Sequence, residues 1–506
     1  MRAMSGFQST VILTLVSLFA QGTRFLFQVL LSRTVGAEVM GLYQLVMSVM
    51  PVVMSLTAIG LTSACSQLTA RYQALGNRRA SVRVVRLSVG LFFLSLGLVA
   101  LAALPARAFI AGQLLGDLRV QGALLLLLPC ILLTGVENIH KHFFYGAGAV
   151  VEPALTEAGE QLVRTGAVLG LLWYFLPQDP GETVTLILWG MILCEVFSAC
   201  TLILLFRRAM GPYPPGPGVE RRVALTQIRR IALPVGCTAL LGNLMGAWTA
   251  ALIPRRLAAS GLESGAALQA FGILKGMTLP LLSLPMAAIG ALSLVLLPKM
   301  AQAHALGRSD LCRRRLSRAL AATALLGLPT AALLSVLAPT LGLLLFREAS
   351  AGDLAPLLAL GILLPCFETV FTVTLNGLGK QRLTAAYALF CGAVQLGLTW
   401  WRMGAAGLRG YAEALALSAL LGMLLNGWTV LRSLKLKPDW FSWLIGPALA
   451  AILAALCVNL LLPMLGTLGA VGACAGAAAF GLTVDLAALA AMGLLPRRKR
   501  IKRAPT

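Results

Sequence analysis

Residues 268–308, LQAFGILKGMTLPLLSLPMAAIGALSLVLLPKMAQAHALGR, form a long apolar run that contains Lys275 and ends in a basic loop. Residues 41–79, GLYQLVMSVMPVVMSLTAIGLTSACSQLTARYQALGNRR, have the same plan. In both stretches a proline precedes Ala-Ile-Gly, and Ala-Leu-Gly then begins the basic loop. Ala-Ile-Gly stands at Ala58–Gly60 and at Ala288–Gly290, and Ala-Leu-Gly stands at Ala74–Gly76 and at Ala305–Gly307. The two motifs therefore recur with almost the same offset along the chain.

A second pair of landmarks repeats with this offset. Glu137 lies nine residues before Gly146, and Glu368 lies nine residues before Gly377. Both members of the pair recur at the distance that separates the two Ala-Leu-Gly motifs. Matching of small residues by chance could produce one such coincidence but hardly four. The sequence therefore predicts an internal duplication.

The composition indicates a polytopic membrane protein. Hydrophobic residues make up 58% of the 506 residues and charged residues only 12%, whereas a soluble domain has about 25% charged residues. Many runs of about 20 apolar residues are long enough to cross ~30 Å of hydrocarbon as a helix. The runs are continuous rather than alternating, which excludes a β-barrel.

We expect about fourteen transmembrane helices and no strands, an all-α fold. The expected spans are 8–31, 42–69, 87–112, 121–145, 155–176, 184–206, 231–254, 269–297, 317–345, 355–376, 383–401, 409–430, 441–463 and 468–495.

The net charge of +23 has a topological explanation. Thirty of the 41 Lys and Arg residues fall in loops and tails on the side of the two termini, and eight fall on the other side. Because short cytoplasmic loops are rich in Lys and Arg, we expect a cell-membrane protein with both termini in the cytoplasm. Nucleic acid is not an expected partner.

A basic Pro/Gly segment divides the first twelve spans into two sets of six. It contains GPYPPGPG at residues 211–218, a stiff non-helical sequence. Parallel repeats around a central cavity are a known transporter plan. We expect an N-lobe (1–206), a linker (207–230), a C-lobe (231–432), two extra helices (433–495) and a polybasic cytoplasmic tail (496–506).

Charged residues within the spans are the candidate site. A charge at the bilayer centre costs roughly 2.5–3.5 kcal/mol on insertion scales, and such residues usually face a cavity or a partner. Arg24 and Lys275 are the candidate cavity cations, and Glu137 and Glu368 are the acids at equivalent positions of the two repeats. The sequence leaves open whether these acids pair with the cations or cap helix ends.

Several other charges have simpler interpretations. Glu160 and Arg164 are four residues apart on one helix, which favours a local salt bridge. Glu157 is expected to be solvated, and Lys141 interfacial.

Three arginines, Arg33, Arg255 and Arg256, are expected at the outer side. They would be interfacial anchors or phosphate contacts at the outer mouth. The tail sequence RRKRIKR is expected to contact anionic lipid.

The sequence gives no support for an enzyme, a metal site or a cofactor. It contains no GxxxxGK[ST] motif and no CxxC pair, and the three His residues do not cluster with Cys. We therefore expect neither metal nor cofactor.

Three segments resemble a known family. They are residues 24–70 (RFLFQVLLSRTVGAEVMGLYQLVMSVMPVVMSLTAIGLTSACSQLTA), residues 252–303 (LIPRRLAASG followed by LQAFGILKGMTLPLLSLPMAAIGALSLVLLPKMAQA) and NGLGKQR at 376–382. They are similar to stage V sporulation protein B and related polysaccharide-biosynthesis exporters, within the multidrug/oligosaccharidyl-lipid/polysaccharide exporter superfamily. The resemblance implies two six-helix lobes that work by alternating access.

The resemblance also implies a function. Lipid II flippases in this superfamily have cavity arginines in helices 1, 2 and 8; Arg24 matches the first, Lys275 stands in helix 8, and helix 2 has no buried cation here. We expect a flippase for a polyprenyl-pyrophosphate-linked saccharide, such as a peptidoglycan precursor for spore cortex. Membrane lipids and envelope-synthesis proteins are the expected partners. The alternatives are a cation-coupled multidrug exporter of the same fold and a non-transporting scaffold.

Overall fold

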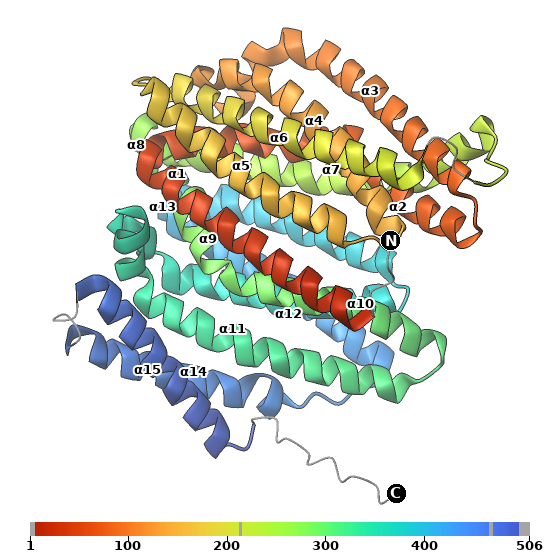
Figure 1. Cartoon of the computed structure of the whole chain (residues 1–506). Coiled ribbons are helices and arrows are strands. Elements are labelled where there is room, and N and C mark those ends of the chain that lie inside the picture. The colour runs from red at the N-terminus through yellow and green to blue at the C-terminus, as the bar shows by residue number, and fades with distance from the viewer. Residues whose placement is uncertain (1–5, 212–214, 465–468, 495–506) are drawn as a thin grey trace, which may run out of the picture. The chain divides into compact units, whose positions relative to one another are not determined.

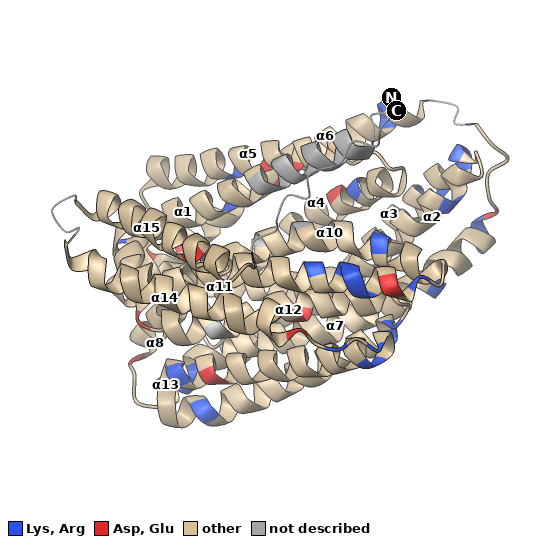
Figure 2. Cartoon of the chain, turned by 90° about the horizontal axis from the view of Figure 1, so that it is seen from below, with Lys and Arg blue, Asp and Glu red and all other residues tan. Residues whose placement is uncertain are grey.

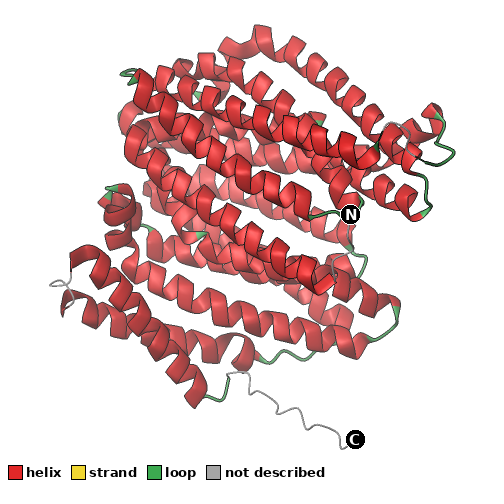
Figure 3. Ribbon diagram, viewed as in Figure 1, coloured by secondary structure: helices red, strands yellow, loops and turns green. Residues whose placement is uncertain are grey.

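The structure is a computed structural model that describes residues 6–211, 215–464 and 469–494. Within these ranges the chain consists of helices and loops, without a strand (Figure 3). The predicted polybasic tail lies outside the described residues.

The α-helices are α1 (Gly6–Thr57), α2 (Ile59–Ala74), α3 (Arg78–Phe109), α4 (Gln121–Gly146), α5 (Val151–Phe175), α6 (Pro180–Met210), α7 (Arg221–Ala259), α8 (Ser264–Ile273), α9 (Leu279–Leu282), α10 (Leu284–Ala305), α11 (Ser309–Phe346), α12 (Ala355–Gly377), α13 (Gln381–Leu434), α14 (Gly446–Leu461) and α15 (Gly469–Ala491) (Figure 1). The described residues also contain three π-helical turns, Ile110–Leu115, Leu274–Thr278 and Phe441–Ile445, and three 3₁₀ turns, Leu118–Val120, Ala349–Gly352 and residues 462–464. Lys and Arg lie mostly near helix ends (Figure 2), which leaves the helix middles apolar.

Two of the helices are bent at a glycine. Gly36 interrupts α1 (φ 77°, ψ 177°) and Gly407 interrupts α13 (φ 56°, ψ −135°), in conformations that glycine adopts readily. Helix α13 therefore holds two of the expected spans, 383–401 and 409–430, and α1 holds the span 8–31 and the first part of the span 42–69. Among the described residues, eleven helices are long and apolar enough to cross a membrane, or twelve if a bent pair at 349–377 counts as one span. The membrane class is confirmed, while the number fourteen stays a prediction.

The chain forms two compact units. Unit 1 contains the chain up to Pro280 together with Gly392–Tyr411, and unit 2 contains Leu281–Cys391 and the chain from Ala412 onward. In unit 1, α1 packs against α5, α7 and α8, and α2 packs against α4 and α7. In unit 2, α10, α11 and α12 pack together, and α14 lies against both α11 and α15. Since α7 and α8 pack within unit 1, the lobe boundary expected at the linker stays a prediction from the repeat.

The linker lies against the turn between α2 and α3. The Asn77 side chain donates to the Gly218 carbonyl at 2.9 Å and accepts from the Gly218 amide at 3.1 Å. The Arg79 amide donates to Pro215 O at 3.0 Å, and Arg83 donates to Val219 O at 2.6 Å. Residues 215–220 are not helical, and these hydrogen bonds hold them to unit 1.

The duplication is visible in matching turns. Gly76 and Gly307, which follow α2 and α10, take φ angles of 70° and 65°. The amide after each glycine donates to the carbonyl five residues earlier, at 2.8 and 3.0 Å. Gly148 and Gly379, which follow α4 and α12, take φ angles of 75° and 78°, and the same type of bond measures 2.9 Å in both. The members of each pair are separated along the chain by the offset of the sequence repeat.

The duplication also extends to helix packing. Gly146 on α4 lies directly on the backbone oxygen of Ser66 on α2, so that an added Cβ would overlap that atom. Gly377 on α12 lies in the same way on α10, where an added Cβ would come within 2.7 Å of Met300 Cβ and 3.3 Å of Leu297 O. Ser66 and Leu297 are themselves equivalent positions of the two repeats. The repeated glycines thus allow the same close helix contact in each unit.

We predict that Gly146→Ala and Gly377→Ala each lower stability by about 1–3 kcal/mol, because the added methyl overpacks the contact. The measurement is thermal unfolding of the purified protein in detergent. Gly90→Ala is the matched control: Gly90 lies within α3 with no atom within 4 Å of the new Cβ. That change should be neutral or stabilise by about 0.5–1 kcal/mol. Equal effects at all three glycines would contradict the packing account.

Candidate functional site

Lys275 lies in the π-helical turn Leu274–Thr278, between α8 and α9. Its Nζ lies 3.3 Å from the Tyr411 hydroxyl, to which it donates, and 5.5 Å from the centre of the Tyr411 ring. Among the described residues, no carboxylate lies within ion-pair distance of this ammonium group. Within the described ranges, the groups that offset its positive charge are a hydroxyl and an aromatic ring.

A cavity of about 210 Å³ lies beside Lys275 within unit 1. Its walls come from α1, α7 and α8, and its lining residues besides Lys275 are Gln44, Met47, Ser48, Pro51, Asn243, Gly246, Ala247, Ala250 and Phe271. The small residues of α7 leave the space open, while Gln44, Ser48 and Asn243 make part of the wall polar. The cavity can thus accept a small polar or anionic group.

Pro51 adds polar backbone to this wall. Proline has no N–H, so α1 supplies no helical hydrogen bond to the carbonyl of Met47, four residues earlier. Asn243 Nδ2 donates to Pro51 O at 3.0 Å, which ties α7 to the same turn of α1.

Close packing of α8 on α1 fixes the position of Lys275. An added Cβ at Gly272 would overlap Ala37 O, and one at Gly276 would overlap the Met40 side chain. Gln28 Nε2 on α1 donates to Gly276 O at 2.8 Å, inside the π-helical turn. π-Turns within helices often occur at functional sites, and this one is held to α1 next to the lysine.

Arg24 lies one helical turn before Gln28 on α1. Its Nη2 is 3.1 Å from Glu157 Oε1 on α5, and its side chain remains 54% exposed. Glu157 is therefore an ion-pair partner rather than a merely solvated acid. Among the described interactions, none joins Arg24 directly to Lys275.

Glu137 belongs to the same chain of charges. Lys141 Nζ lies 3.1 Å from Glu137 and 3.7 Å from Glu157, so the order is Arg24, Glu157, Lys141, Glu137. The Glu137 side chain is 3% exposed and lies well inside α4. It thus pairs with Lys141 rather than with Arg24 or Lys275, and it does not cap a helix.

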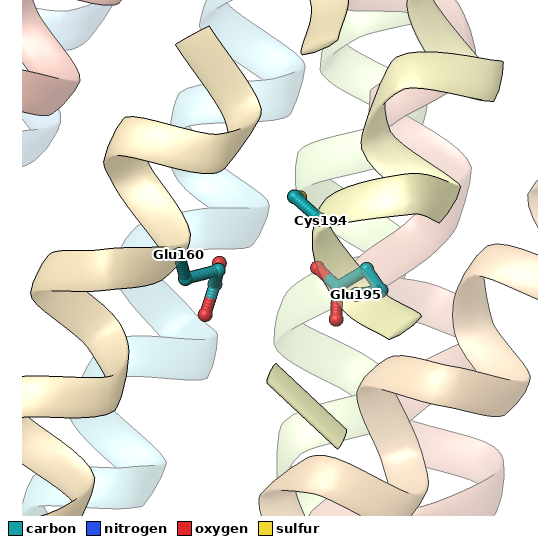
Figure 4. A group of neighbouring side chains, drawn as sticks. All are labelled: Glu160, Cys194 and Glu195. Atoms are coloured by element: carbon teal, nitrogen blue, oxygen red, sulfur yellow. The ribbon is translucent and has the colours of Figure 1, made fainter. Parts of the chain in front are cut away.

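The expected bridge between Glu160 and Arg164 is present and has a third member. Arg164 Nη2 contacts Glu160 and also Glu195 Oε1 on α6 at 3.4 Å. Its Nε points to Cys194 Sγ at 3.4 Å. In Figure 4, Glu160 on α5 faces Cys194 and Glu195 on α6. These three side chains are close enough for a metal site, but the Arg164 guanidinium already bonds to all three, which does not fit a metal cation.

Glu368 lies in unit 2, well inside α12. One carboxylate oxygen is 3.4 Å from Asn426 Nδ2 on α13, and the carboxylate packs on Gly422, where an added Cβ would lie 2.7 Å from its Cδ. Among the described residues it has no cationic partner within ion-pair distance. It therefore neither caps a helix nor pairs with a described cation.

The three arginines expected at the outer side differ in their contacts. Arg256 donates from Nε and Nη2 to Trp400 O at 3.0 and 2.6 Å, and its guanidinium stacks 4.6 Å from the Trp400 ring. Arg255 donates to Gln113 O. Arg33 is exposed on α1, three residues before the Gly36 break. Arg255 and Arg256 thus bond to backbone carbonyls, and both interpretations of these arginines, as interfacial anchors or as phosphate contacts, stay predictions.

Five members of the charge network were not among the predicted site residues: Lys141, Glu157, Glu160, Arg164 and Glu195. For Glu160 and Arg164 the sequence predicted only their mutual bridge. Lys141 follows Glu137 by four residues, a spacing that could have indicated their bridge. Glu157 and Glu195 are joined to their partners across helices, and no local pattern indicates such contacts.

Family models match most of the chain. The model described as polysaccharide biosynthesis protein matches residues 7–304, more than half of the sequence. The chain belongs to the polysaccharide biosynthesis protein family. A second model, described as lipid II flippase MurJ, matches residues 173–475 of this family member. The resemblance seen in the sequence is therefore confirmed at the level of the family.

A curated relative and two solved structures are similar to this polysaccharide biosynthesis family member. Stage V sporulation protein B of Bacillus subtilis (strain 168) is 23% identical over 65% of this chain, and the chain spans 64% of that relative, less than two thirds. A lipid II flippase MurJ in an inward closed conformation superposes with a TM-score of 0.72 at 12% identity, over 95% of this chain and 98% of the other. An inward-facing multidrug resistance MATE family transporter gives 0.64 at 16% identity, over 84% and 99%. At these identities the structures show a shared fold.

We predict that Arg164→Met destabilises the protein by about 3–5 kcal/mol, because it leaves a buried Glu160 without its counter-charge. Arg24→Gln breaks a largely exposed pair and should change stability by about 0–1 kcal/mol. Both are measured by unfolding of the purified protein in detergent. A small effect of Arg164→Met, similar to that of Arg24→Gln, would contradict the assignment of a buried network.

Proposed function

We propose that this protein moves a polyprenyl-pyrophosphate-linked saccharide across the cytoplasmic membrane by alternating access. The observation that carries the proposal is Lys275, an ammonium group beside a polar cavity and without an acidic partner among the described residues. An anionic headgroup that enters the membrane needs such a counter-charge, since unpaired charge is costly there. The role is transport without covalent chemistry.

Lys275 and Arg24 are the proposed headgroup contacts. Lysine binds phosphate as a point charge with three donors, and Asn243 and Gln44 can donate to phosphate or sugar oxygens. The Ser48 hydroxyl already donates to Leu45 O at 2.6 Å and can accept from a sugar hydroxyl. Arg24 is more than half exposed, so its guanidinium can contact an anion while it stays near Glu157. Glu137 acts on Arg24 indirectly, through Lys141 and Glu157.

Two further elements complete the proposal. The apolar tail of the substrate would remain in lipid, so only the headgroup needs a polar path. Glu368 in unit 2 is the proposed acid of the second repeat. The basic loops on the side of the two termini support a cytoplasmic location for both ends.

The names of the similar proteins support this substrate class. One family model and one solved structure are those of lipid II flippase MurJ, and the curated relative is a sporulation protein. A peptidoglycan precursor, including one for spore cortex, is therefore the first cargo to test.

A second candidate is a cation-coupled multidrug exporter. The fold likeness to a MATE family transporter and the buried acids Glu160 and Glu195 favour it. A drug exporter would remove cationic dyes from cells, whereas a flippase for an anionic headgroup would not.

We predict that cells depleted of this protein accumulate a lipid-linked saccharide with its headgroup on the inner face. The measurement is accessibility of lipid II and other polyprenyl-linked sugars to an external probe. Wild-type protein restores accessibility, and Lys275→Gln fails because the counter-charge is lost, while Lys275→Arg retains part of the function.

Arg86→Gln is the matched control, since Arg86 is exposed on α3 and away from the cavity. It should restore accessibility fully. If no precursor changes sides on depletion, the flippase proposal is wrong, and dye efflux then tests the second candidate.

A further inference from the structure

The ion pairs of unit 1 form a network with unequal charge. Four acids on α4, α5 and α6 (Glu137, Glu157, Glu160 and Glu195) meet three cations on α1, α4 and α5 (Arg24, Lys141 and Arg164). The two parts of the network influence each other, because the Glu137 carboxylate repels the carboxylates of Glu160 and Glu195. If every acid were ionised, the described network would have a net charge of −1.

This excess charge lies mostly away from water. The Glu137, Glu160 and Glu195 side chains are only 3–6% exposed, and Glu195 lies in the middle of α6. An uncompensated carboxylate in such surroundings is strongly disfavoured. The network therefore needs one more positive charge, either a proton or a bound cation.

The geometry favours a proton and indicates where it sits. Glu160 is fully engaged, since one oxygen contacts Arg164 and the other accepts from Ser198 at 3.3 Å. Glu195 has a long 3.4 Å contact to Arg164, and the Thr134 hydroxyl lies near its carboxylate but donates to Cys130 O. The buried Oε2 of Glu195 is without a well-formed hydrogen bond among the described residues. A metal cation would have to displace the guanidinium between the two acids.

We propose that Glu195 is a proton-binding site, and that its occupancy is linked through the network to whatever contacts Arg24. A proton on Glu195 makes the network neutral. If Arg24 is withdrawn from Glu157, Lys141 must balance both Glu157 and Glu137, and the network gains net negative charge. Loss of the Arg24 charge therefore favours the proton.

The link gives the proton a role in transport, and this part rests on the proposed function. An anionic headgroup that binds Arg24 draws it from Glu157 and so favours proton uptake. By reciprocity, a protonated Glu195 favours headgroup binding by the same factor. The network would then couple cargo movement to the proton gradient.

Other titratable groups face the cluster and must be separated from Glu195 in a test. They are Tyr43 on α1, Cys130, His142 and Tyr145 on α4, and Cys194 on α6. None of them is a carboxyl group. A signal specific to protonated carboxyl groups therefore distinguishes Glu195 from them.

The test is infrared spectroscopy of the purified protein, following the C=O band of protonated carboxyl groups from acid to alkaline pH in H₂O and D₂O. At neutral pH the wild type should show a component that Glu195→Gln lacks. Asp485→Asn is the matched control, because Asp485 is a buried acid on α15 in unit 2, and that variant should retain the component. If Glu195→Gln does not fold, Glu195→Asp replaces it and must change the position of the component.

The link to Arg24 is tested with the same signal and no ligand. Arg24→Gln should raise the pH at which the component disappears. The shift should be a fraction of the roughly 1–3 pH units that a direct charge partner produces. Arg86→Gln changes an exposed arginine outside the network and should leave this pH unchanged.

Absence of the component in wild type, or its persistence in Glu195→Gln, would overturn the proton site. An unmoved midpoint in Arg24→Gln would overturn the link. Because no cargo is used, these results do not depend on the proposed function.

Discussion

A charged side chain in a membrane needs an opposite charge close by, and the arrangement of unit 1 depends on this constraint. The helices α1, α4, α5 and α6 contribute acids and cations that alternate from Arg24 to Glu137, and a second group surrounds Arg164. Each pair compensates for charges that would otherwise oppose insertion. Helix α5 carries three of these residues, and it is not among the eleven helices that are apolar enough to cross a membrane by composition alone.

Helix α1 connects this network with the cavity. Arg24 and Gln28 lie one turn apart on it; the first contacts the network and the second holds the turn that contains Lys275. Further along, Gln44, Ser48 and Pro51 form one wall of the cavity. Glycines on α8 and the π-helical turn allow close contact with α1. A shift of α1 would therefore act on both the charges and the cavity.

The sequence predicts some of these features because they are local. The duplication is visible as repeated glycines, and most of the repeated pairs have the same turn or helix contact in the structure. The pair Gly60 and Gly290 is an exception, because Gly60 packs on Ala232 O while an added Cβ at Gly290 would meet no atom within 4 Å. The bridge of Glu160 with Arg164 follows from a four-residue spacing within one helix. The apolar runs are sufficient to assign the membrane class.

Other features depend on contacts between distant segments, and no spacing indicates them. Glu195 joins Arg164 across two helices, and Gln28 bonds to a carbonyl far along the chain, at Gly276. The number of spans is also difficult to predict, because bends at glycine join consecutive spans into single helices.

The measurement that most directly tests the central claim is transbilayer movement of labelled lipids in vesicles that contain only this purified protein. A polyprenyl-pyrophosphate-linked saccharide and a neutral glycolipid with the same sugar are compared side by side. The account predicts that the protein speeds movement of the pyrophosphate-linked lipid alone, because its cavity offers a counter-charge. Equal movement of both lipids, or of neither, would contradict it.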